Sequence, residues 1–196
     1  MSKSYKELVD LYENIFKPAY ADLVAYIGDK PIDILIEIEN TLSHIFVALN
    51  DNEQEEIRKS NIEKAYNHLI RATLDCYKLL WVKLNEDIDR IFEIKTKRLA
   101  LNISEYELIK LRNSFKEKAK EARKAELKNI GRNPLFPVKL YIEAIEIGKQ
   151  ILDSFDESKE REIKKFSIKS KWIELLIAFI IGLLSGLLSN FIFNLL

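Results

Sequence analysis

Three polar residues in the segment 65–81 are spaced so that they share one face of a helix. His68, Arg71 and Asp75 follow one another at i, i+3 and i+7, and side chains three or four positions apart lie side by side on a helix. An imidazole beside an arginine–aspartate ion pair offers an acid or base with a cation nearby, as ribonucleolytic chemistry requires. The stronger alternative is structural, with a salt-bridged helix face and His68 packed in a bundle.

A second candidate site is the basic segment from Lys110 to Arg132, which holds nine Lys and Arg against three Glu. Four of its cations fall within two helical turns and suit an anionic ligand such as RNA, a nucleotide second messenger or a lipid phosphate: Lys116, Lys120, Arg123 and Lys124. Phe115 is the aromatic available for base stacking. Interleaved glutamates favour the alternative of a solvated, ion-paired helix.

Other catalytic signatures do not occur in the sequence. It has no phosphate-binding glycine loop, no dinucleotide-binding glycine pattern and no nucleophile elbow. Two histidines and one cysteine do not make a zinc site, and Glu37 and Glu39 face different sides of a helix. We therefore expect no cofactor, no metal and a non-enzymatic protein.

Composition predicts a helical domain in a reducing compartment. The chain carries 31 basic and 31 acidic residues, so global charge favours no class of partner. Cys76 is the one cysteine, and the first residues contain no apolar signal-peptide core. Glycine and proline are too few to punctuate an all-β or α/β chain.

The apolar periodicity predicts about five helices before residue 159. The first is interrupted by Pro18 and closed by Gly28, and the second runs from Pro31 to about Asn50. The third begins at a capping box of Ser60 and Glu63 and extends to about Leu101. The fourth begins at Ser104 with Glu107 and stops near Gly131, and the fifth follows Pro137. The alternating isoleucines from Ile32 to Ile38 also fit a strand, but no second strand exists to pair with it.

These elements predict an all-α fold, an elongated antiparallel helical bundle with a C-terminal transmembrane helix. We expect a cytosolic bundle over 1–158, a basic juxtamembrane segment over 159–171 and the membrane helix over 172–196. The uncharged run from Leu175 to Leu196 would rise about 33 Å as a helix, close to the thickness of a bilayer's hydrocarbon core.

One side of the membrane helix is small and partly polar. Its residues are the predicted oligomerisation face: Ala178, Gly182, Ser185, Gly186, Ser189, Asn190 and Asn194. A GxxxG spacing lets two helices approach closely in lipid, so we expect a homo-oligomer. Two alternatives stay open, namely a monomeric anchor and a ring of helices whose polar residues line a pore.

Lysines before the span predict its orientation. The candidate contacts for anionic lipid are Lys164, Lys165, Lys169 and Lys171, and basic flanks stay on the cytoplasmic side. Because no loop follows the span, we expect a single-pass protein of the cell inner membrane with its N-terminus in the cytoplasm.

The bundle, with the motif over residues 55–85, resembles the HEPN-like domains of prokaryotic defence and toxin systems. Its coupling to a membrane helix is similar to the small membrane accessory proteins of RNA-targeting CRISPR systems. The HEPN nuclease signature places a histidine five to seven positions after an arginine. His68 follows Arg58 by ten positions and His44 follows no arginine, so the resemblance implies the scaffold without the RNase activity.

Together these features favour a tail-anchored, oligomerising effector that disrupts or forms pores in a membrane during anti-phage defence. The bundle would be its sensor or partner-binding module, for a regulatory protein, RNA or a nucleotide. The alternatives are a membrane-tethered HEPN-like ribonuclease that uses His68, Arg71 and Asp75, and a non-enzymatic scaffold.

Overall fold

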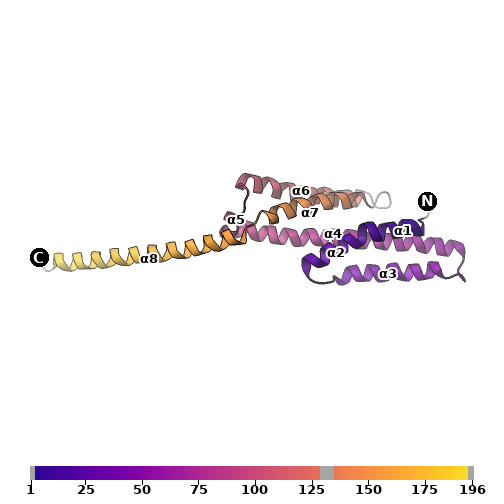
Figure 1. Cartoon of the computed structure of the whole chain (residues 1–196), viewed down its shortest axis with the longest axis horizontal. Helices are drawn as coiled ribbons and strands as arrows, with labels where there is room; N and C mark the ends of the chain where they lie inside the picture. The colour runs from indigo at the N-terminus through magenta and orange to yellow at the C-terminus, as the bar shows by residue number, and fades with distance from the viewer. Residues whose placement is uncertain (1–2, 129–134, 194–196) are drawn as a thin grey trace. The chain divides into compact units, whose positions relative to one another are not determined.

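A computed structural model describes residues 3–128 and 135–193, with side chains as far as Leu187. Throughout these residues the regular elements are helices, so the predicted all-α fold, with a long apolar helix at its C-terminal end, is confirmed (Figure 1). The chain forms two compact units. Unit 1 comprises Met1–Arg90 and Ser104–Asp153, and unit 2 comprises Ile91–Ile103 and Ser154–Leu196.

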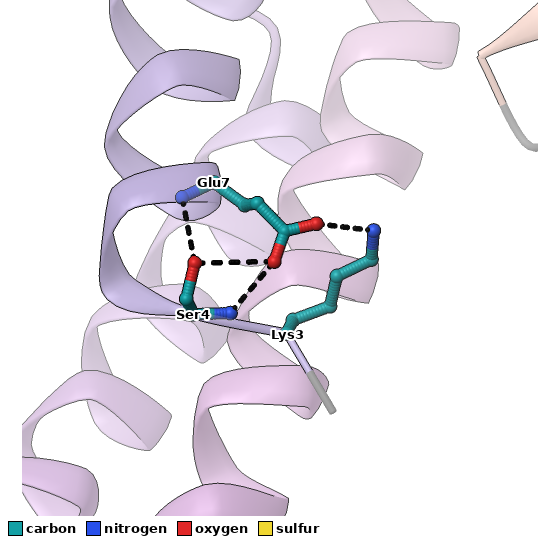
Figure 2. A network of polar contacts seen from close by, with 3 residues as sticks. All are labelled: Lys3, Ser4 and Glu7. Atoms are coloured by element: carbon teal, nitrogen blue, oxygen red, sulfur yellow. Dashed lines mark hydrogen bonds and ion pairs between the residues drawn. The ribbon is translucent and has the colours of Figure 1, made fainter. Parts of the chain in front are cut away.

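The first helix, α1 (Tyr5–Leu11), begins at a capping box. The Ser4 hydroxyl accepts from the backbone N–H of Glu7 at 3.2 Å, and the Glu7 carboxylate accepts from the backbone N–H of Ser4 at 2.9 Å (Figure 2). Lys3 contacts the other carboxylate oxygen at 2.8 Å. The cap therefore satisfies two backbone donors that the start of a helix leaves unpaired.

The predicted interruption at Pro18 is confirmed. A π-helical turn, η1 (Tyr12–Phe16), separates α1 from α2 (Lys17–Ile27), and Pro18 lies in the first turn of α2. Proline has no N–H to donate to the preceding turn, and its ring clashes with the carbonyl four residues earlier. A wider turn relieves that clash. Gly28 then ends α2 with a left-handed φ of 75°, a conformation that glycine adopts without strain.

Helices α3 (Ile32–Leu49) and α4 (Glu55–Glu93) run antiparallel. The alternating isoleucines lie in α3, as predicted. The predicted start of α4 at Ser60 was wrong, because the helix begins five residues earlier and leaves Ser60 in its interior. The predicted end near Leu101 was also wrong, since Ile94 is extended and α5 (Lys95–Leu99) follows it.

The hairpin of α6 (Glu105–Lys128) and α7 (Phe136–Asp153) packs on the C-terminal half of α4. The predicted cap is present, with the Ser104 hydroxyl accepting from the N–H of Glu107 at 3.1 Å. Phe115 is fully buried between the three helices, where a Cβ added to Gly148 would lie 2.8 Å from its ring. Glycine at this position therefore lets α7 approach α6 closely.

Unit 2 holds α5 and the long helix α8 (Glu157–Phe193). Asp156 caps α8 by accepting from the N–H groups of Ser158 and Lys159 at 2.9 and 3.0 Å. A bridge between Leu101 and Phe155 and a 2.9 Å hydrogen bond from Lys159 to the carbonyl of Leu101 hold the start of α8. The predicted juxtamembrane segment is thus part of one continuous helix with the apolar stretch.

Candidate functional sites

A groove of about 700 Å³ lies in unit 1, between α4, α6 and α7. Its lining combines cations with aromatic rings. Four cations contribute, namely Lys78 of α4 and Lys116, Lys120 and Arg123 of α6, together with the rings of Trp81 and Tyr141. Of the four basic residues that the sequence predicted as an anionic site, three line this groove, whereas Lys124 is exposed outside it.

The Trp81 indole stacks on the buried ring of Phe115, with ring centroids 5.5 Å apart and an interplanar angle of 25°. Gly148 leaves room for the Phe115 ring on the side of α7. Close packing of α6 and α7 therefore supports the aromatic side of the groove. Tyr141 is buried, and that burial raises the pKa of its phenol, so it stays protonated at neutral pH.

Ion pairs orient the cations of the groove. Lys78 contacts Asp75 and Glu126, each at 2.9 Å, and Arg123 contacts Glu126 at 2.8 Å. Burial opposes the charge of Lys78, but its hydrogen bonds to the two carboxylates prevail and raise its pKa. Burial likewise opposes ionisation of Glu126, but Lys78 and Arg123 prevail and lower its pKa. Lys78 and Glu126 are therefore both charged at neutral pH.

Two polar atoms among the lining residues are buried and have no hydrogen-bond partner within the described part of the chain. They are the indole Nε1–H of Trp81, a donor, and the side-chain oxygen of Asn85, an acceptor. Asn85 uses its other end, since its amide donates to Asp89 at 2.8 Å. Buried groups of this kind are normally paired, so two residues of the groove lining each keep a hydrogen-bonding atom that no described residue uses.

The α4 residues of the groove were missed by the sequence analysis, although a signal existed. Lys78, Trp81 and Asn85 are spaced i, i+3 and i+7, which places them on one helix face. What could not be read from the sequence is that this face meets the basic face of α6. Only the antiparallel pairing of α4 with α6 brings them together.

The predicted set of His68, Arg71 and Asp75 does not form one cluster. His68 faces α3, where its Nδ1–H donates to the Glu37 carboxylate at 2.6 Å. Asp75 pairs instead with Lys78, and Arg71 is exposed with no ion pair to any described residue. The predicted ion pair between Arg71 and Asp75 is therefore not seen.

His68 instead stacks on the other histidine of the chain, which the sequence analysis left out of this site. The two imidazole centroids lie 5.2 Å apart at an interplanar angle of 24°. The Nδ1–H of His44 donates to the side-chain oxygen of Asn61 at 2.8 Å, while the Asn61 amide donates to the carbonyl of Ile57. Each ring therefore has its proton fixed on Nδ1, which leaves Nε2 as an acceptor when the ring is neutral.

The described residues contain no group of three or more His, Cys, Asp and Glu side chains suited to hold a metal ion. The two histidines, with Glu37, fall short of the ligand number of a structural zinc site.

In unit 2, α8 is the one helix of the described chain long and apolar enough to cross a membrane, and its apolar window is entirely unburied. Trp172 is 70% exposed and Leu175 is 63% exposed. The predicted lipid-contacting lysines, from Lys164 to Lys171, are all exposed on the same helix before the apolar stretch.

The described residues of the predicted oligomerisation face lie along α8. A Cβ added at Gly182 or Gly186 meets no atom within 4 Å, and the two glycines lie in a shallow open recess with Phe179, Leu183 and Leu187. Ala178 and Ser185 are exposed as well. The structure describes Ser189 and Asn190 by their helical backbone alone, and Asn194 lies outside the described residues.

Comparison with known proteins gives no relative from which a function can be transferred. No protein-family model, curated protein or solved structure matches the chain.

Proposed function

We propose that this chain is a single-pass membrane protein with a cytoplasmic helical bundle, and that its copies associate through α8 to disturb a bacterial inner membrane. The observation that carries the proposal is the exposed apolar surface of α8. From Leu175 to Phe193 the helix has no charge and rises about 28 Å. That length matches the hydrocarbon core of a bilayer.

The energy of insertion supports a membrane rather than an aqueous setting. This stretch contains thirteen Leu, Ile and Phe residues, and together they favour insertion by about 4–8 kcal/mol. In water the same side chains form an apolar surface far larger than soluble proteins expose. The lysines between residues 164 and 171 support an orientation with the bundle in the cytoplasm.

Self-association is supported by the recess at Gly182 and Gly186. Lipid is as apolar as leucine, so helices associate in it by close backbone approach and by hydrogen bonds between polar side chains. The glycines permit that approach, and Ser185 lies beside them. The resemblance of the bundle to HEPN-like domains supports anti-phage defence as the setting, with the bundle as sensor of a regulatory protein, RNA or nucleotide.

The test is the membrane potential of a bacterium that expresses the chain from a titrated promoter. The full chain is compared with a version ending at Lys171 and with the double variant Gly182→Leu/Gly186→Leu. A matched control, Ile180→Phe/Leu184→Phe, adds bulk on the opposite side of α8. Because a Cβ added at either glycine meets no atom of the same chain within 4 Å, the comparison with the matched control reports on association between chains.

We expect depolarisation with the full chain and with the matched control, and none with the truncated chain or the glycine variant. Depolarisation by the chain ending at Lys171 would contradict the proposal, as would an equal loss in both double variants. Absence of depolarisation, when the protein is confirmed to be present in the membrane, would exclude membrane disruption as the function. The remaining candidate would be a membrane-anchored scaffold.

A second candidate function is a membrane-tethered ribonuclease, favoured by the stacked pair of His44 and His68. Fixed Nδ1 protons leave two Nε2 atoms for acid and base roles on adjacent rings, with Glu37 orienting His68. Total RNA from cells expressing the chain tests it. Cleavage that is lost with His68→Gln and kept with the exposed neighbour change Asn67→Ala would support the enzyme, and intact RNA would exclude it.

A further inference from the structure

We propose that the groove between α4, α6 and α7 binds a mononucleotide-type ligand, with its base against Trp81 and its phosphate on the cations of α6. The inference goes beyond the membrane activity proposed above and does not depend on it. All lining residues belong to unit 1. The volume of about 700 Å³ is within the usual range for small-ligand sites.

The aromatic part of the groove is suited to a flat ring. Trp81 is held in place from beneath by Phe115 at 5.5 Å, so it loses little freedom when a base stacks on it. Base stacking on an aromatic side chain is worth a gain in affinity of about fivefold to 150-fold. Tyr141 supplies a second ring from α7.

The two unpartnered atoms add a recognition edge. The Trp81 N–H donates and the Asn85 oxygen accepts, one helical turn apart on α4. A nucleobase edge carries both a donor and an acceptor, as adenine does at N6 and its ring nitrogens. Both atoms are closed to solvent, so a ligand reaches them only if the Trp81 and Asn85 side chains turn toward it. A base edge would then satisfy both atoms, which a purely anionic ligand would not.

The cations can bind a phosphate without loss of contacts that the fold depends on. Lys116 contacts Asp89 at 3.3 Å, Lys120 contacts Glu117 at 3.3 Å, and both lysines are substantially exposed. Exposed pairs of this kind contribute little stability. Each ammonium has three donors, so a lysine that holds one carboxylate keeps donors for a phosphate oxygen, while Arg123 offers a planar fork.

Other phosphate ligands fit the groove less well. A lipid headgroup brings a phosphate but no ring for Trp81 and no edge for Asn85. Single-stranded RNA is bound along extended basic tracks that stack successive bases, whereas this groove presents one supported indole. A free nucleotide uses the cations, the rings and the two unpartnered atoms together.

The test uses the full chain in detergent micelles, carrying Trp172→Phe so that Trp81 is the remaining tryptophan. Titration with AMP is followed by indole fluorescence. Lys116→Gln/Arg123→Gln removes two groove cations, and Lys128→Gln/Lys139→Gln is the matched control, with two exposed lysines of α6 and α7 outside the groove lining. Adenosine, ribose 5-phosphate, a ten-nucleotide RNA and vesicles containing phosphatidylglycerol are the comparison ligands.

We expect saturable quenching by AMP, at least tenfold weaker binding in the groove variant and an unchanged affinity in the control. Adenosine and ribose 5-phosphate should each bind more weakly than AMP. Calorimetry on Trp81→Phe, which keeps a ring but removes the N–H, should also show weaker binding. Three results would overturn the inference: no saturation with AMP, GMP, CMP or UMP at millimolar concentration, equal affinity in the groove variant and its matched control, or binding confined to RNA or vesicles.

Discussion

At the scale of single residues, the cap at Ser4 and Glu7 makes a prediction about pH. The hydrogen bond from Lys3, followed by that from the Ser4 backbone, lowers the pKa of Glu7 from 4.5 to about 2. A lowered carboxyl pKa means that the capping contacts are fully present above pH 4.5 and are lost as the pH falls toward 2. An NMR titration of the Glu7 side-chain carbon should therefore give a midpoint near 2.

Ser4→Ala provides the control for this titration. Without the serine hydroxyl one capping bond is lost, so the Glu7 midpoint should move upward and α1 should fray at neutral pH. Ser43→Ala, an exposed change within α3, should leave the midpoint unchanged. A wild-type midpoint near 4.5 would mean that the cap does not form in solution.

Cys76 supports a second prediction at this scale. The side chain is fully buried, and burial raises the pKa of its thiol from 9.0 to about 12. Since the thiolate is the reactive form, alkylation by iodoacetamide at pH 8 should be at least about a hundredfold slower in the folded chain than in urea. Mass spectrometry of this one cysteine measures it directly, and fast labelling of the folded chain would show that α4 is open at this position.

At the scale of elements, the contact between Gly148 and Phe115 decides how closely α6 and α7 pack. A methyl group at Gly148 would lie 2.8 Å from a ring that is fully buried and cannot swing away. Gly148→Ala should therefore lower the free energy of unfolding by about 1–3 kcal/mol, as overpacking does. Chemical denaturation measures the loss.

The change at Gly148 should also be felt in the groove, because Phe115 supports Trp81. The emission of Trp81, measured with Trp172→Phe, should shift with Gly148→Ala. Ala144→Gly, a change one turn earlier at another buried position of α7, makes a cavity instead of a clash and is the control for general destabilisation. A stability equal to wild type in Gly148→Ala would show that the helices are not in close contact here.

Local sequence signals predicted those helix ends that depend on nearby residues. Pro18, Gly28 and the Ser104 cap act within one turn and were identified correctly. Ser60 and Glu63 carry the same capping pattern in the interior of α4, because the helix continues in both directions through them. A capping-box sequence can stabilise the start of a helix, but it does not by itself cause a helix to start there.

The sites depend on contacts between elements, and the sequence predicted them only in part. The basic face of α6 was evident from spacing, whereas Trp81 joins it through the packing of α4. His68 was identified as a candidate, but its partners Glu37 and His44 lie on α3 and are set by the antiparallel arrangement of the two helices. The apolar periodicity of a sequence predicts helices, but it does not predict which helices pack against one another.

At the scale of the whole molecule, the chain combines a bundle that carries a basic, aromatic groove with a helix suited to lipid. The two parts make separate predictions. Groove variants should change ligand binding without releasing the chain from membranes, and removal of the apolar part of α8 should do the reverse. The apolar length of α8 is evident from the sequence alone, since a run without charge is a property of neighbouring residues.

Carbonate extraction of membranes from cells that express the full chain or the chain ending at Lys171 tests directly whether α8 spans the bilayer. Alkaline carbonate releases peripheral proteins but leaves spanning helices in the bilayer. We expect the full chain to stay in the membrane pellet and the shortened chain to appear in the soluble fraction. Release of the full chain by carbonate would contradict a membrane-spanning α8 and, with it, the proposed function.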